Sequence, residues 1–232
     1  MRIKWLPLTV GISEAQLVRR LRDMPFTRSD EPLTRGFRIE RASKGQVTGQ
    51  YIEQEVTDRA VSLPDGTEIQ QELVEVTVTN FRIDMERPLG LEVRNPPRSL
   101  MPFIGAIGSA SDFAVTVDSR MKVDLRQAVK EFRRLVGVPS AVCALECSGI
   151  ELERGVVASL GMSGTDDVLS SFDNLPFSSQ RSSIDSLRVD FVLDGGKCSV
   201  EVTKAGAAKI RGAAAEFVAG CVHGSFERAL LR

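Results

Sequence analysis

The segment KCSVEVTKAG, residues 197–206, holds the residues of this chain whose types and spacing come closest to catalytic chemistry. In restriction-type nucleases, an acidic residue and a following Glu-x-Lys pair on adjacent strands bind a divalent cation and position the attacking water. The matching residues here would be Asp190, Asp194, Glu201 and Lys204. Side chains alternate along a regular strand, so Glu201 and Lys204, three positions apart, point to opposite faces. Only a bulge near Thr203 would bring them together, and a divergent nuclease is therefore the least favoured function.

Nucleophilic catalysis and phosphate-loop chemistry lack the partners that they need in this sequence. A Ser or Cys nucleophile requires a base, and the single histidine, His223, has no recognisable catalytic partner. His223 lies at helical spacing from Glu216 and Glu227, which indicates either a metal site or, as we favour, a solvated helix face. The segment VLDGGKCS lacks the upstream glycine of GxxxxGK[ST] and predicts a turn. We expect no catalytic residue, metal or cofactor.

The composition is that of a globular protein of one large or two small domains. The chain has 232 residues, of which 42% are hydrophobic and 26% charged. Residues 1–11 lack the long apolar stretch of an export signal, and charged residues interrupt the apolar segment 205–231. We therefore expect a cytoplasmic protein without a membrane partner. The four cysteines have no CxxC spacing and are predicted to be reduced thiols in the core.

The net charge of −1 conceals an uneven distribution along the chain. Residues 1–45 hold ten basic and five acidic residues, whereas residues 46–95 hold four basic and ten acidic ones. Segments of opposite sign can cover one another in a fold, so this distribution is weak evidence for a polyanionic partner. A wholly basic protein is excluded.

The first half of the chain predicts a strand, a helix and an antiparallel meander. Ser13 and Gln16 have the spacing of a capping box at the start of the helix. Residues 36–95 then alternate in the manner of strands, with LPDGTE as a turn. A helix over 99–110 and a short strand, FAVTVD, follow.

The long run ELVEVTVTNFRIDM changes its apolar parity along its length. Val74, Val76 and Val78 stand at even positions, whereas Phe81, Ile83 and Met85 stand at odd ones. A continuous strand cannot direct both sets to one face, so the sequence predicts a bulge or break near Thr79 and Asn80.

The segment DLRQAVKEFRRLVGVP predicts the best-defined helix, with Asp124 as its N-cap and Gly137 as its stop. Four cations share one face of this helix: Arg126, Lys130, Arg133 and Arg134. Such a row can follow a phosphate backbone, and nucleic-acid binding through it is the alternative function. A solvated helix face is the simpler interpretation, because Glu131 lies among the cations.

The second half predicts further strands, a short helix near TDDVLSSF, an exposed loop FSSQRSSIDS, and a hairpin, LRVDFVL with KCSVEVT. A long Ala-rich helix is expected to follow, with a smooth strip of Ala208, Gly212, Gly220 and Gly224 suited to packing or to a subunit interface. FRIDM and LEV, before the helix at 99–110, repeat this order about 109 positions earlier. An internal duplication of a strand, strand, helix unit is thus one interpretation.

These observations predict an α+β fold of antiparallel sheets with helices packed on one face. Whether the chain consists of two related halves stays open. The expected domains are residues 1–139 and 140–232, with one continuous domain as the alternative. Because residues suited to catalysis do not converge, we expect a noncatalytic binding or assembly protein that engages another protein or itself.

Overall fold

The structure is a computed structural model that describes residues 1–29, 31–62, 64–65, 68–153, 155–175 and 183–231. By its contacts the chain divides into two compact units. The N-terminal unit is Pro7–Val117, and the C-terminal unit combines Met1–Leu6 with Asp118–Arg232. The domain boundary that the sequence suggested, residue 139, lies inside the C-terminal unit. The expected α+β class is confirmed, with antiparallel sheets and, among the described residues, five helices packed around them.

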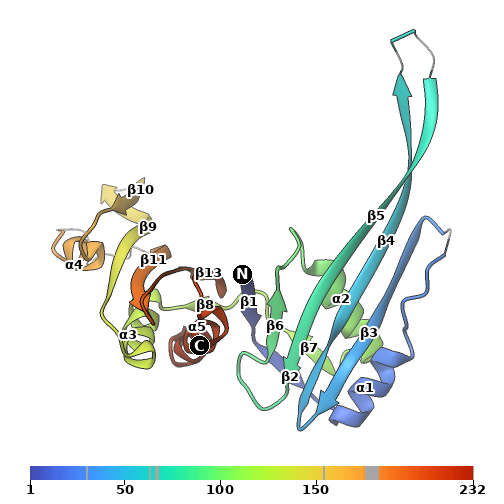
Figure 1. Cartoon of the computed structure of the whole chain (residues 1–232), viewed down its shortest axis with the longest axis horizontal. Helices are drawn as coiled ribbons and strands as arrows, with labels where there is room; N and C mark the ends of the chain where they lie inside the picture. Colours follow the sequence, from blue (N-terminus) through green and yellow to red (C-terminus); the bar gives the residue numbers. More distant parts are fainter. Residues whose placement is uncertain (30, 63, 66–67, 154, 176–182, 232) are drawn as a thin grey trace. The chain divides into compact units, whose positions relative to one another are not determined.

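The sheet of the N-terminal unit is an antiparallel meander with helices beside it (Figure 1). Its strands pair in chain order: β3 (Leu33–Ser43), β4 (Gln46–Ser62), β5 (Glu68–Asp84) and β6 (Leu91–Arg94). The remaining elements are α1 (Glu14–Arg22), α2 (Met101–Ala110), and the short paired strands β2 (Leu8–Val10) and β7 (Val115–Val117). The expected helix and meander are confirmed, whereas the expected first strand, RIKWLPLTVG, is divided at Pro7 into β1 (Arg2–Leu6) of the other unit and β2.

An aromatic cluster joins the sheet of this unit to α2. Phe103 of α2 lies 5.2 Å from Phe81 and 5.7 Å from Tyr51, measured between ring centroids. Phe37 of β3 completes the cluster, 5.3 Å from Tyr51. Aromatic rings at such separations add specific contacts to the free energy gained by burial. The face of the sheet that carries Phe81 is therefore the core face.

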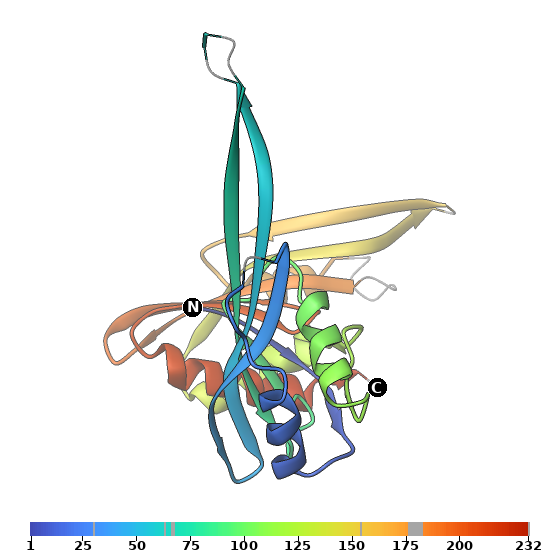
Figure 2. The ribbon, with the colours of Figure 1, turned by 90° about the vertical axis from the view of Figure 1, so that its right-hand side faces the viewer.

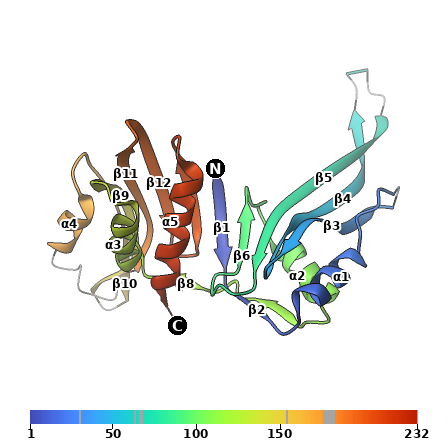
Figure 3. The same ribbon diagram turned by 60° about the horizontal axis from the view of Figure 1, so that its bottom comes forward.

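The C-terminal unit has a sheet with two helices side by side against it (Figure 3). Its strands pair in the order β10 (Val156–Ser163), β9 (Ser140–Glu153), β11 (Ser183–Leu193), β12 (Gly196–Thr203), β13 (Ala207–Arg211) and β1 (Arg2–Leu6). The helices are α3 (Leu125–Val136), α5 (Ala215–Arg228) and the short α4 (Val168–Asp173). Strands β8 (Lys122–Val123) and β14 (Leu230–Leu231) pair with each other.

Two predicted elements of this unit are confirmed in detail. In the β11–β12 hairpin, Val189 pairs with Val200, and the turn residues Asp194 and Gly195 have φ of 50° and 76°. Positive φ at both positions suits the tight turns that match the twist of a hairpin. Helix α3 starts after Asp124, whose carboxylate accepts hydrogen bonds from two backbone amides, and ends at the left-handed Gly137. Residues 177–182 of the expected loop FSSQRSSIDS lie outside the described residues, and its last four residues, 183–186, begin β11 instead of a loop.

The long terminal helix is shorter than predicted, because a strand precedes it. In β13, Ala208 and Ile210 are buried while Lys209 and Arg211 are exposed, which is the alternation of a strand. Helix α5 begins only at Ala215. The predicted strip of small residues is therefore not one helical surface, since Ala208 and Gly212 precede the helix.

The two units share an order of elements. Each has a short strand, a helix, four strands that pair in sequence, a helix, and a final short strand that pairs with the first. In the C-terminal unit, β10 and α4 are inserted between the first and second of these strands. A strand, strand, helix order recurs in both units, as β5–β6–α2 and β12–β13–α5, but the predicted correspondence of residues is shifted by one strand, because β13 separates the β11–β12 hairpin from α5.

Candidate interaction surface

Strands β4 and β5 form a long hairpin that extends past the rest of its sheet (Figure 2). The two strands pair over 17 positions, from Gln46 with Asp84 to Ser62 with Glu68. Strand β3 accompanies β4 only as far as the pair of Leu33 with Glu55. Residues 56–74 beyond that pair are called the arm.

The predicted bulge near Thr79 is absent from the described ladder, because every residue of β4 pairs one-to-one with a residue of β5. The two apolar sets of β5 therefore lie on opposite faces of the strand. Phe81 and Ile83 are buried in the core face, at 4% and 0% exposure. Val74, Val76 and Val78 stay exposed at 41%, 53% and 39%, and are called the valine row. The change from even to odd apolar positions along β5 was the feature of the sequence that indicated the exposed valine row.

The outer edge of β5 is open along most of its length. Strand β6 pairs only with Asn80 to Ile83 of β5. From Glu68 to Thr79, no strand of the described chain pairs with this edge. A long exposed edge strand presents backbone donors and acceptors to any chain that can pair with it.

The arm and its base are strongly acidic. Between Glu53 and Glu75 the sequence holds seven acidic residues against a single basic one, Arg59. Like charges spaced along an edge strand oppose its pairing with another copy of itself. The same charges repel a phosphate backbone, so this surface does not suit nucleic acid.

The core of the unit does not require a hairpin of this length. The hairpin at the corresponding place in the C-terminal unit, β11–β12, has 8 pairs and closes in a tight turn. The arm adds strand pairs whose side chains are exposed on both faces, including Leu73 at 47% and Ile69 at 48%. A two-stranded ribbon gains little stability by itself, which points to a role outside the fold.

Polar contacts hold the base of the arm, which is residues 51–55 of β4. Gln54, only 3% exposed, donates to the Ser29 carbonyl at 2.7 Å. The Tyr51 hydroxyl donates to Glu53 at 3.0 Å, and Arg35 lies 3.2 Å from the same carboxylate. Burial, followed by the hydrogen bond and charge of Glu53, raises the pKa of Tyr51 well above its ordinary value.

The four predicted nucleic-acid-binding residues lie on α3, where three of them have carboxylate partners. Arg126 pairs with Asp173 and lies over the Phe172 ring at 5.3 Å, and Arg133 pairs with Asp167. Arg134 lies 3.1 Å from Glu131, and Lys130 is exposed. These carboxylates neutralise much of the positive charge of the face. The predicted role of the four residues stays a prediction.

The nuclease candidates do not form a catalytic cluster. Glu201 is exposed between its cross-strand neighbours Arg188 and Lys209, on a strand that pairs regularly to its last residue, Thr203. Lys204 instead pairs with Asp185. Burial acts to raise the pKa of Asp185, but hydrogen bonds from Lys204 and Ser148 outweigh it and hold the pKa below its ordinary value.

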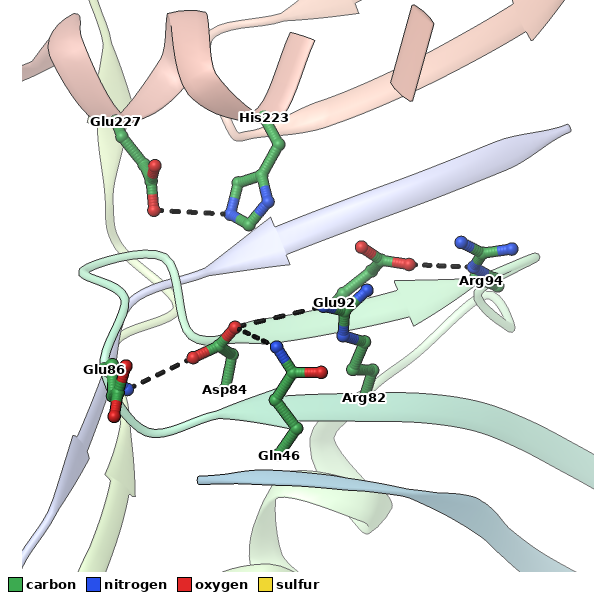
Figure 4. Close-up of polar contacts among 8 residues, drawn as sticks. All are labelled: Gln46, Arg82, Asp84, Glu86, Glu92, Arg94, His223 and Glu227. Atoms are coloured by element: carbon green, nitrogen blue, oxygen red, sulfur yellow. Dashed lines mark hydrogen bonds and ion pairs between the residues drawn. The ribbon is translucent and has the colours of Figure 1, made fainter. Parts of the chain in front are cut away.

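His223 does not lie on a solvated face as predicted. It is 6% exposed, stacks on Trp5 with ring centroids 5.4 Å apart, and its Nε2 lies 3.6 Å from Glu227 (Figure 4). The four cysteines are free and buried, as expected. Among the described residues, no three His, Cys, Asp or Glu side chains gather in a way that could hold a metal ion.

Within the described part of the chain, none of the helices combines the length and the apolar character needed to cross a membrane. The chain matches no model of a known protein family and no curated protein. The interpretation of the surface therefore depends on its own geometry and charge.

Proposed function

We propose that this chain is a noncatalytic binding or assembly protein that engages another protein through the arm. The observation that carries the proposal is the valine row, which lies exposed along the open edge of β5. The fold leaves apolar surface and backbone hydrogen-bonding groups uncovered at the same place. A bound strand would cover both.

Strand addition explains how the surface would work. An extended segment of the partner would pair with β5 between Glu68 and Thr79, and main-chain hydrogen bonds would supply affinity. Side chains of that segment would pack beside Val74, Val76 and Val78. Each valine is about half exposed, so its burial contributes on the order of 1 kcal/mol.

The charge of the arm favours a partner with a basic segment. Lys or Arg residues on the incoming strand would lie near Glu72 and Glu75. Opposite charges that face each other across neighbouring strands are stabilising, whereas like charges are destabilising. Two arms of this chain would bring acidic strands together, so we propose a different, basic protein as the partner.

The test places a photoreactive amino acid at Val76 in the native cell, with a matched control at Leu73. Leu73 is also exposed on β5 but points to the other face, because it is an odd number of positions away. We expect one discrete adduct from position 76, little from position 73, and loss of the adduct when Val74 and Val78 are both replaced by Thr.

Equal adducts from both positions, or none from position 76, would contradict the proposal. An adduct of twice the chain mass in the purified protein would identify a second copy as the partner and overturn the assignment to a different protein.

A further inference from the structure

The turn between β3 and β4 lies at the end of the N-terminal sheet opposite to the arm (Figure 1). A hollow of about 370 Å³ lies beside this turn. It is lined by Arg41, Ser43, Lys44, Gln46, Thr48 and Arg82. Every one of these residues belongs to the N-terminal unit. The hollow is separate from the valine row and from the open edge of β5.

The register of the sheet gathers two of the cations. Thr48 of β4 pairs with Arg41 of β3 on one side and with Arg82 of β5 on the other. Residues paired across neighbouring strands point to the same face, and the strands are about 4.8 Å apart. Both guanidinium groups therefore extend from one face with the Thr48 hydroxyl between their strands.

The turn adds the third cation. Lys44 and Gly45 connect β3 to β4 with φ of 55° and 75°, the conformation of a tight hairpin turn. Such a turn fixes the backbone of Lys44 at the rim of the hollow. The Ser43 hydroxyl precedes it.

Two of the three cations of the hollow, Arg41 and Lys44, are exposed, whereas Arg82 has carboxylate neighbours. None of the described residues that line it is acidic.

Several carboxylates adjoin the hollow. Asp84 accepts hydrogen bonds from Gln46 at 2.9 Å and from the Glu86 amide at 3.2 Å, and lies 3.9 Å from the Arg82 guanidinium (Figure 4). Glu92 of β6 is the cross-strand partner of Arg82, and Glu14 accepts a hydrogen bond from the Gly45 amide in the turn.

We infer that this hollow binds the phosphate groups of a small phosphorylated molecule. Guanidinium groups recognise phosphate oxygens in pairs, a lysine adds a mobile point charge, and hydroxyls donate to the remaining oxygens. The volume lies in the range of small-molecule sites and exceeds what one phosphate fills. The adjoining space would accommodate the rest of the ligand.

The test titrates the full chain with pyrophosphate by calorimetry at fixed ionic strength, with sulfate as a competing anion. We expect saturable binding that is at least tenfold weaker in Arg41→Gln and in Arg82→Gln. The matched control is Arg22→Gln, which removes one exposed cation at the end of α1, outside the hollow. Circular dichroism melting curves of each variant confirm that the fold is retained.

Pyrophosphate that does not bind, or that sulfate displaces at equal concentration, would overturn the inference. Equal weakening by Arg22→Gln would also overturn the inference, because the loss of affinity would then follow the net charge of the protein and not the residues of the hollow.

Discussion

Val56 and Val74 lie opposite each other in the first strand pair of the arm, on the face of β5 that does not carry Phe81 and Ile83. The apolar side chains of one strand thus serve two surfaces, the core near one end and an exposed row further along. Regular pairing makes this unavoidable, since an even and an odd position never share a face. The exposed row is consistent with the proposed role in binding.

Shortening the arm should leave the fold intact. Replacing residues 56–74 by Asn-Gly would close the hairpin directly after the pair of Glu55 with Glu75, with a sequence that favours a tight turn. Because the removed side chains are mostly exposed, we expect the free energy of unfolding in urea to change by no more than about 1 kcal/mol. The variant should also lose the crosslinked partner. A loss of several kcal/mol would show that the arm is structural.

The single tyrosine should resist ionisation in the folded protein. The raised pKa of Tyr51 means that the folded state keeps the proton, so its contribution to stability is complete below pH 10. That contribution is lost as the pH rises above the pKa of the unfolded chain, near 10, toward the higher folded value. Tyrosinate absorbance should therefore appear only with unfolding, and Tyr51→Phe should flatten the alkaline decline in stability. A native titration near pH 10 would contradict this.

The carboxylates beside α3 should limit its affinity for nucleic acid. Asp167→Asn and Asp173→Asn together remove the charged partners of Arg133 and Arg126, while the new amide oxygen at position 167 can still cap α4. We expect tighter DNA binding in anisotropy titrations. The plot of log affinity against log salt concentration should have a slope that is steeper by about 2.

The control for this experiment is the pair Asp194→Asn and Glu201→Gln, which changes the net charge equally at exposed sites of the same unit. If both double variants behave alike, or if neither binds DNA at low salt, the alternative function is excluded for this face.

Local sequence patterns correctly predicted elements whose apolar side chains are buried inside the fold. The alternation around Val189 and Val200 identified a hairpin, and Asp124 with Gly137 marked the ends of α3. Each of these signals depends on neighbours within a few positions, so no tertiary information was required.

The errors arose where burial or pairing depends on distant residues. The prediction of a bulge assumed that every valine of β5 must enter the core, whereas the row stays exposed. The partners of Arg126 and Arg133 come from α4 and its N-cap, 47 and 34 positions later, and periodicity on one helix cannot reveal them. The hollow near Lys44 could not be predicted either, because it depends on the pairing register of β3, β4 and β5.

The pairing of Asn80 with Arg94 sets a limit on what the open edge can accept. A strand added beside β5 would lie end to end with β6 and would meet Arg94 when it passed Thr79. The edge without a strand partner is thus at most the twelve residues from 68 to 79, about 40 Å at 3.4 Å per residue, and Pro97, Arg98 and Ser99 lie near its last positions. A longer segment would have to leave the sheet at that point, so the position of β6 fixes both the maximum length of the bound strand and the place where its chain must turn away.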